Sequence, residues 1–89
     1  MLLFKARAAL NDWQTTDEQV TLYRKTVRDY NGLLTGERTL FNNGESSLFM
    51  VNSREMGYIN AKIKLVELLA KNRKARVSAD YTFGILSVE

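Results

Sequence analysis

Apolar and small residues recur along the first half of the chain at steps of three, four or seven. This heptad spacing places side chains on one face of an α-helix and does not suit a strand, whose faces alternate with every residue. Two polar residues, Thr16 and Glu37, interrupt the row. The pattern predicts an amphipathic helix from about residue 2 to residue 41. The row consists of Leu2, Ala6, Ala9, Trp13, Val20, Tyr23, Val27, Tyr30, Leu34 and Phe41.

A second helical pattern covers residues 47–84 and contains two apolar rows. The first row, which Arg73 and Asp80 interrupt, consists of Met56, Ile59, Ile63, Val66, Ala70, Val77 and Gly84. The second row consists of Leu48, Val51, Tyr58, Leu65 and Leu69. A helix that packs against one neighbour needs only one apolar stripe. Two rows therefore predict contact with two neighbours, as in a larger wall or bundle of helices.

The residues between the two patterns, 42–46, are typical of a turn. Asn43 and Gly44 tolerate left-handed backbone angles and can end the first helix. Ser46 or Ser47 can cap the second helix by accepting a hydrogen bond from a free backbone amide. Since the turn is short, the two helices are expected to be antiparallel neighbours.

Asn52 and Glu55 have the spacing of a capping box, so the second helix could also begin at Asn52. We prefer Ser47 as the cap because Leu48 and Val51 already belong to the helical rows. Each helix then has about 35–40 residues and a length of roughly 55–60 Å. The predicted fold class is all-α, a long antiparallel two-helix coiled-coil hairpin.

The composition favours association over chemistry. The chain has 89 residues, no cysteine, no histidine and no proline. It therefore has no disulfide, no thiolate metal site and no histidine base, and nothing in its composition interrupts long helices. A domain this small and unstapled usually needs a partner. We expect the hairpin to form a homo-oligomer, most simply a four-helix bundle of two hairpins, without a cofactor.

The candidate catalytic side chains do not combine into an active site. Ser46, Ser47 and Ser53 have no histidine to activate them and lie where helix caps are expected. Asp17 and Glu18 are adjacent in sequence, so they point to different helix faces and do not readily share a metal. The sequence therefore predicts neither an enzyme nor a metal site.

Gly32 and Gly36 lie four residues apart in the first helix and have two interpretations. They could form a small-residue groove that lets a neighbouring backbone approach closely, or they could simply loosen the helix end, since glycine destabilises a helix by about 1 kcal/mol relative to alanine. The segment lacks the lysine that a phosphate-binding loop needs.

The positive charge lies in the second half of the chain. The formal net charge is +3, and residues 1–46 are balanced. The run at residues 71–76 could contact nucleic-acid phosphates, but no helix-turn-helix, zinc finger or basic zipper surrounds it. Cations near the end of a helix are also favoured by its dipole, so we predict a solvated face and no nucleic-acid partner. The basic residues are Arg54, Lys62, Lys64, Lys71, Arg73, Lys74 and Arg76.

Residues 41–84 resemble the last coiled-coil hairpin of the outer-membrane efflux protein family, whose best-known member is TolC. The most specific part is the string GESSLFMVNSRE, which begins at Gly44. Residues 1–40 match the family only as generic heptads. The positions that match without a gap are Phe41, Gly44, Ser46, Ser47, Leu48, Val51, Ala61 and Gly84.

The resemblance implies a location and partners. Such channels are homotrimers in the outer membrane, and their helical hairpins form a periplasmic tunnel used in tripartite efflux or type I secretion. The hairpin tips contact a periplasmic adaptor protein, which links to an inner-membrane pump. A complete channel also has a signal peptide, a second hairpin and barrel strands, so the chain would be a fragment. The expected adaptor-docking residues are Asn42, Asn43, Gly44, Glu45, Ser46, Ser47 and Leu48.

An unrelated helical-hairpin scaffold that dimerises remains the alternative interpretation. Its physical requirements are the same as those of the channel hairpin, and only the string from Phe41 to Arg54 argues against it.

Overall fold

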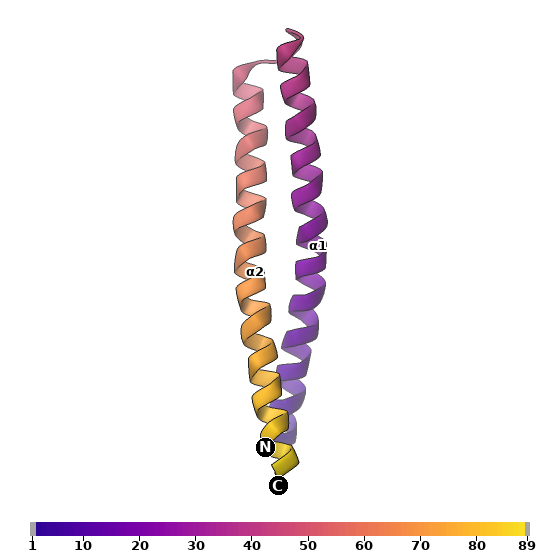
Figure 1. Ribbon diagram of the computed structural model, residues 1–89, viewed down its shortest axis with the longest axis vertical. Coiled ribbons are helices and arrows are strands. Elements are labelled where there is room, and N and C mark those ends of the chain that lie inside the picture. Colours follow the sequence, from indigo (N-terminus) through magenta and orange to yellow (C-terminus); the bar gives the residue numbers. More distant parts are fainter. Residues whose placement is uncertain (1, 89) are drawn as a thin grey trace. The chain divides into compact units, whose positions relative to one another are not determined.

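The computed structural model describes residues 2–88 as two α-helices joined by a short turn (Figure 1). Helix α1 covers Leu2–Asn42 and helix α2 covers Leu48–Val88. The described residues contain no β-strand. The prediction of an all-α hairpin is therefore confirmed. Helix α2 continues through Gly84 to Val88, four residues beyond its predicted end.

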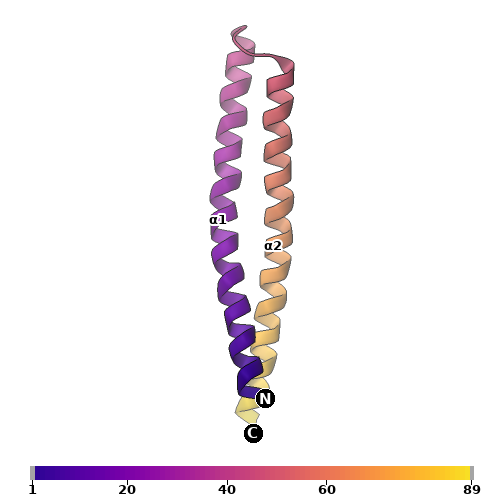
Figure 2. The ribbon, with the colours of Figure 1, turned by 180° about the vertical axis from the view of Figure 1, so that it is seen from behind.

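The chain divides into two compact units. The turn unit, Leu22–Leu65, contains the end of α1, the turn and the beginning of α2. The terminal unit contains residues 2–21 of α1 and residues 66–88 of α2. Within each unit a segment of α1 runs beside an antiparallel segment of α2 (Figure 2).

Helix α1 packs against α2 through the row that the sequence predicts. In the terminal unit, Ala6 and Val20 are buried, at 1% and 8% exposed. In the turn unit, Leu34 and Glu37 are buried, at 2% and 8%. The intervening row positions Ala9, Trp13, Thr16, Tyr23 and Val27 are half-buried. Only Tyr30 and Phe41 are more exposed, and Leu2 lies outside the side chains that the structure describes.

Helix α2 faces α1 with a different row from the first one predicted. Its buried residues are Val51, Ala61, Leu68 and Ala79. The half-buried residues Arg54, Tyr58, Leu65, Asn72, Ala75 and Thr82 complete this inner row at steps of three and four. The first predicted row is exposed: Met56 56%, Ile59 39%, Ile63 53%, Val66 64% and Val77 62%. The sequence did not indicate which row faces α1; in the structure, Val51, Tyr58 and Leu65 of the second predicted row do, and the first predicted row lies on the outer face of α2.

In the turn unit, a large ring of α1 lies against a glycine of α2. The Tyr30 ring lies so close to Gly57 that a Cβ at this position would be 2.8 Å from Tyr30 Cε1. Large and small side chains that face each other fill space as well as two medium-sized ones do. Ranking positions by hydrophobicity therefore selects the outer row of α2, while the packing partner of α1 is the less apolar row.

A polar layer sets the register of the two helices in the terminal unit. The Asn72 side-chain amide donates to Thr16 Oγ1 at 3.0 Å and to Asp17 Oδ1 at 2.6 Å. Val20 and Leu68 each lie four residues from this pair, one in each helix, and both are buried. Within a heptad row, one asparagine can fix register because any slip leaves its amide without partners. Thr16, an interruption in the predicted row, is thus one side of a specific polar contact.

Candidate docking site at the turn

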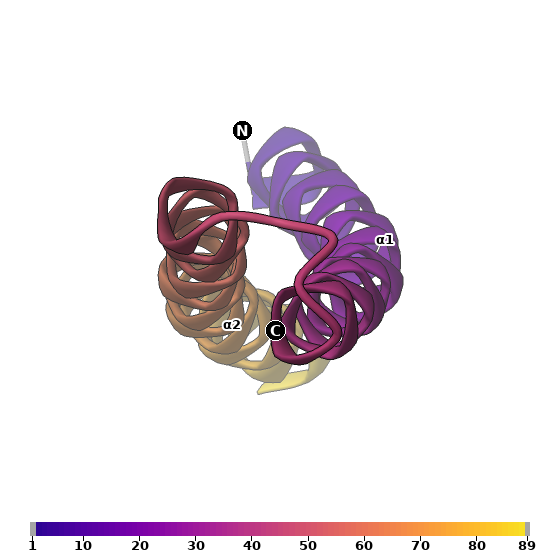
Figure 3. The same ribbon diagram turned by 90° about the horizontal axis from the view of Figure 1, so that it is seen from above.

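Helix α1 ends in a Schellman motif centred on Gly44. The Glu45 amide donates to the Leu40 carbonyl at 2.8 Å, and the Gly44 amide donates to the Phe41 carbonyl at 3.0 Å. Gly44 has a φ of 77°, the left-handed conformation that glycine adopts without a steric penalty. Figure 3 shows the turn leaving the end of α1 and crossing to the start of α2.

Ser47 caps α2, as the sequence predicts. Its hydroxyl accepts a hydrogen bond from the Met50 amide at 3.2 Å, and its carbonyl accepts one from the Val51 amide at 3.1 Å. The first bond satisfies one of the backbone donors that a helix start leaves free. Helix α2 therefore begins at Leu48, and the later start at Asn52 is excluded.

A polar clasp centred on Glu37 ties the turn to both helices. The Ser46 hydroxyl donates to Glu37 Oε2 at 2.5 Å, and Arg54 Nε donates to Glu37 Oε1 at 3.3 Å. Glu37 belongs to α1, Ser46 to the turn and Arg54 to α2. Because both carboxylate oxygens are bonded, the buried charge is satisfied, and the turn is held against the helices on either side of it.

The clasp stabilises the ionised form of Glu37. The Ser46 hydrogen bond is the main cause that lowers the pKa of Glu37 below its ordinary value of 4.5. Burial acts in the opposite direction, and the hydrogen bond and positive charge of Arg54 lower this pKa further. A carboxylate that accepts hydrogen bonds in its charged form holds its proton less tightly.

Glu37 should therefore make the stability of the hairpin depend on pH. The folded pKa lies below the unfolded value of 4.5, so the contribution is present above that value and is lost as the pH falls through the folded pKa. We expect Glu37→Gln to lower the urea midpoint at about pH 7 and to approach the wild type at about pH 2. Glu45→Gln, at an exposed turn carboxylate, is the control and should follow the wild type throughout. Equal midpoints for Glu37→Gln and wild type near neutral pH would contradict the clasp.

The seven predicted docking residues all lie at the turn or at the adjoining helix ends, but they do not all face outward. Six are exposed, whereas Ser46 is half-buried because its hydroxyl is bonded to Glu37. Leu48 is 61% exposed, and its neighbour Phe49 is 78% exposed. The exposed residues are Asn42, Asn43, Gly44, Glu45, Ser47 and Leu48. The turn thus presents polar groups beside two exposed apolar side chains.

Three residues of this region were not predicted as part of the site: Glu37, Arg54 and Phe49. Glu37 and Arg54 are 17 residues apart, so their contact can be predicted only when the register of the two helices is known. An acid in an otherwise apolar row, with an arginine in the facing helix, was the available signal. For Phe49 the signal was its place beside Leu48, outside every predicted row.

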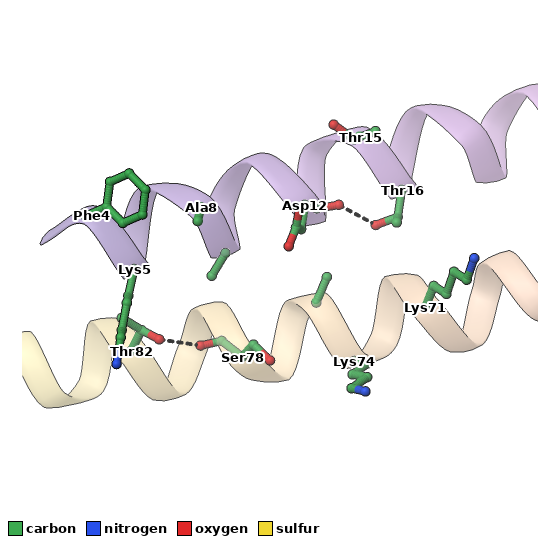
Figure 4. Close-up of a pocket in the computed structure, with 12 residues that line it drawn as sticks. Phe4, Lys5, Ala8, Asp12, Thr15, Thr16, Lys71, Lys74, Ser78 and Thr82 are labelled. Atoms are coloured by element: carbon green, nitrogen blue, oxygen red, sulfur yellow. Dashed lines mark hydrogen bonds between the residues drawn. The ribbon is translucent and has the colours of Figure 1, made fainter. Parts of the chain in front are cut away.

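The basic run of α2 is spread around the helix in the terminal unit. Lys71 and Lys74 line a groove between the helices of the terminal unit, together with Lys5 and Asp12 of α1 (Figure 4). The Arg76 guanidinium lies 6.0 Å from the centroid of the Trp13 ring. The remaining member, Arg73, lines an adjoining shallow surface formed by α2 residues alone, which shares Lys74 with the groove. The four basic side chains are exposed, as expected of a solvated face. The expectation that the helix dipole favours them is wrong, because α2 continues to Val88 and has no basic residue in its last turn. The absence of a nucleic-acid partner stays a prediction.

Gly32 and Gly36 lie on an open face of the turn unit. A Cβ at either position would meet no heavy atom within 4 Å. Their small size therefore serves no contact among the described residues, and the groove interpretation stays untested.

Within residues 2–88, no helix contains an apolar stretch long enough to cross a membrane. The same part of the chain holds no cluster of acidic side chains suited to a metal ion. Comparisons with known protein families, curated proteins and solved structures gave no match. The likeness to outer-membrane efflux proteins thus rests on the residues quoted above.

Proposed function

We propose that the chain is a helical hairpin from the periplasmic part of a TolC-like outer-membrane channel, and that its turn docks onto a periplasmic adaptor. The parent would be a homotrimer in the cell outer membrane. The adaptor would link it to an inner-membrane pump for tripartite efflux or type I secretion. The hairpin would have no catalytic role. The string that begins at Gly44 supports this proposal, because it forms the turn and the first turns of α2.

One structural observation carries the proposal: a well-braced turn exposes apolar side chains. Hydrogen bonds of the backbone, of Ser47 and of Glu37 hold the turn. Leu48 and Phe49 nevertheless remain 61% and 78% exposed beside it. Binding sites lose less conformational entropy when they are preorganised, and aromatic side chains such as phenylalanine are enriched in protein interfaces.

Docking is tested by measuring binding of the hairpin to the periplasmic adaptor encoded beside its gene. The double variant Leu48→Glu/Phe49→Glu should weaken binding by about 30-fold or more, the effect of losing one strong hot spot. The fold should persist, because acidic residues are favourable in the first turn of a helix. Gly44→Trp, which adds bulk at the tip, should also weaken binding, but it strains the left-handed backbone of the turn, so the double variant is the deciding one.

Leu22→Glu is the matched control. Leu22 is 59% exposed in the turn unit but belongs to α1 and is separated from the turn by 20 residues of that helix. This variant should bind the adaptor like the wild type. Equal loss of binding in Leu22→Glu and in the double variant would contradict docking through the turn.

A dimerising helical scaffold is the second candidate function, and the outer row of α2 favours it. In the turn unit, Met56 and Ile63 are more than half exposed although both are strongly apolar. Rows of this kind are typical of helices that pack against a further helix. If no adaptor binds the hairpin while it self-associates stably, the scaffold becomes the better interpretation.

A further inference from the structure

The outer face of α2 in the turn unit carries an uncharged row with heptad spacing. It consists of Asn52, Met56, Ile59 and Ile63, at steps of four, three and four. Met56 is 56%, Ile59 39% and Ile63 53% exposed. Three apolar side chains at coiled-coil spacing form the seam that a second helix needs. Nothing among the described residues covers this seam.

The outer face of α1 in the same unit differs. Lys25, Gly32 and Thr39 occupy it at seven-residue spacing, and all three are exposed. None of them can contribute to an apolar seam. Three leucines of α1 are also exposed on another face of that helix, but Asp29 interrupts their row. The more continuous apolar row of this unit is therefore on α2, so an assembly of two copies would place the two α2 helices against each other.

The charges that flank the row indicate how the two helices would run. Glu55 and Lys62 both border the row and lie seven residues apart. Glu55 has no ion-pair partner among residues 2–88, and Lys62 lies over the Tyr58 ring, 4.7 Å from its centroid. In an antiparallel pair with Met56 facing Ile59 of the second copy, Glu55 of each copy borders Lys62 of the other. In a parallel, in-register pair Glu55 would border Asn60, and both of these ion pairs would be lost.

We propose that a second copy of this chain docks on the outer row of α2, antiparallel, with Met56 of each copy facing Ile59 of the other. The contact is isologous, so every interaction occurs twice about a two-fold axis. Asn52 then faces Ile63 of the second copy at the two ends of the row, where its amide stays near solvent. This association does not depend on the adaptor. Phe49, three residues before Asn52, extends the row toward the turn, but the interface variants in the tests below change only Glu55, Lys62, Met56 and Ile59, none of which is a proposed docking residue, so the two proposals can fail separately.

The first test measures the molar mass in solution for the wild type and for variants in which the charges of Glu55 and Lys62 are reversed. One chain has a mass of 10.2 kDa, and at about 100 µM the wild type should have twice this mass. Glu55→Lys and Lys62→Glu should each weaken association about tenfold, because each places two like-charge pairs at the interface. The double variant Glu55→Lys/Lys62→Glu should restore the wild-type affinity. Lys25→Glu, a charge reversal on the outer face of α1, is the control and should change nothing.

The second test is disulfide trapping, for which a chain without cysteine is well suited. A mixture of Met56→Cys and Ile59→Cys chains should oxidise mainly to the mixed disulfide. Ile59→Cys alone should cross-link more slowly, because position 59 of one copy faces position 56, not position 59, of the other. Faster cross-linking of Ile59→Cys alone than of the mixture would overturn the antiparallel register. This comparison of rates holds even if a cysteine substitution changes the stability of the hairpin. A wild-type mass of 10.2 kDa at the same concentration would overturn the association itself.

Discussion

Replacing Leu34 by alanine is expected to remove most of the stability of the turn unit. Leu34 is 2% exposed, and truncating such a leucine costs about 2–5 kcal/mol through lost burial and the cavity left behind. Small domains without staples rarely gain more than about 3–5 kcal/mol from their core. We therefore expect Leu34→Ala to be largely unfolded at room temperature, measured by urea titration with far-ultraviolet circular dichroism.

The adjacent residue provides the matched control for this experiment. Leu33 is 46% exposed, and alanine has the highest helix propensity, so Leu33→Ala should stay within about 1 kcal/mol of the wild type. Equal destabilisation by the two variants would mean that α1 does not face α2 through the row that contains Leu34.

The second large effect is expected at Ala61, where a small residue lies between the helices. Ala61 is 5% exposed, so Ala61→Glu would place a carboxylate in the α1–α2 contact without a partner. An unpaired buried charge costs about 3–5 kcal/mol, comparable with the entire stability of a small domain. Ala61→Glu should consequently lose its helical signal at concentrations where the wild type is folded.

Ile63→Glu is the informative comparison because it removes a much larger apolar side chain. Ile63 is 53% exposed on the outer face of α2, and its replacement should leave the single hairpin folded in dilute solution. Its effect should appear only in association between copies. A reversed order, with Ile63→Glu unfolded and Ala61→Glu folded, would show that α2 packs on α1 through the outer row.

The contrast between Ala61 and Ile63 also explains how far the sequence could predict the fold. Heptad spacing predicts both helices, and the Asn-Gly-Ser chemistry predicts the turn and the Ser47 cap. The facing row of α2 could not be chosen by apolarity, because it includes Arg54, Ala61 and Asn72, whereas the outer row carries Met56, Ile59 and Ile63. Which row faces α1 depends on how the two helices are aligned, and the sequence of one row alone does not specify that alignment.

The site shows the same division between local and non-local signals. Gly44 and Ser47 act through neighbours in sequence, so their roles could be predicted from the residues alone. The clasp joins Glu37 to Arg54 in the other helix, and it exists only once Val51 and Leu34 are buried in register. The location of the turn could therefore be predicted from the sequence, whereas the interaction of Glu37 with Arg54 that stabilises it could not.

The most direct test of the proposed docking is to map where the adaptor touches the hairpin. A photoreactive phenylalanine analogue at position 48 or 49 should cross-link to the adaptor on illumination, because both positions are exposed beside the turn. The same analogue at position 22, exposed on α1 and separated from the turn, should not. Cross-links from position 22, or from all three positions equally, would contradict docking through the turn.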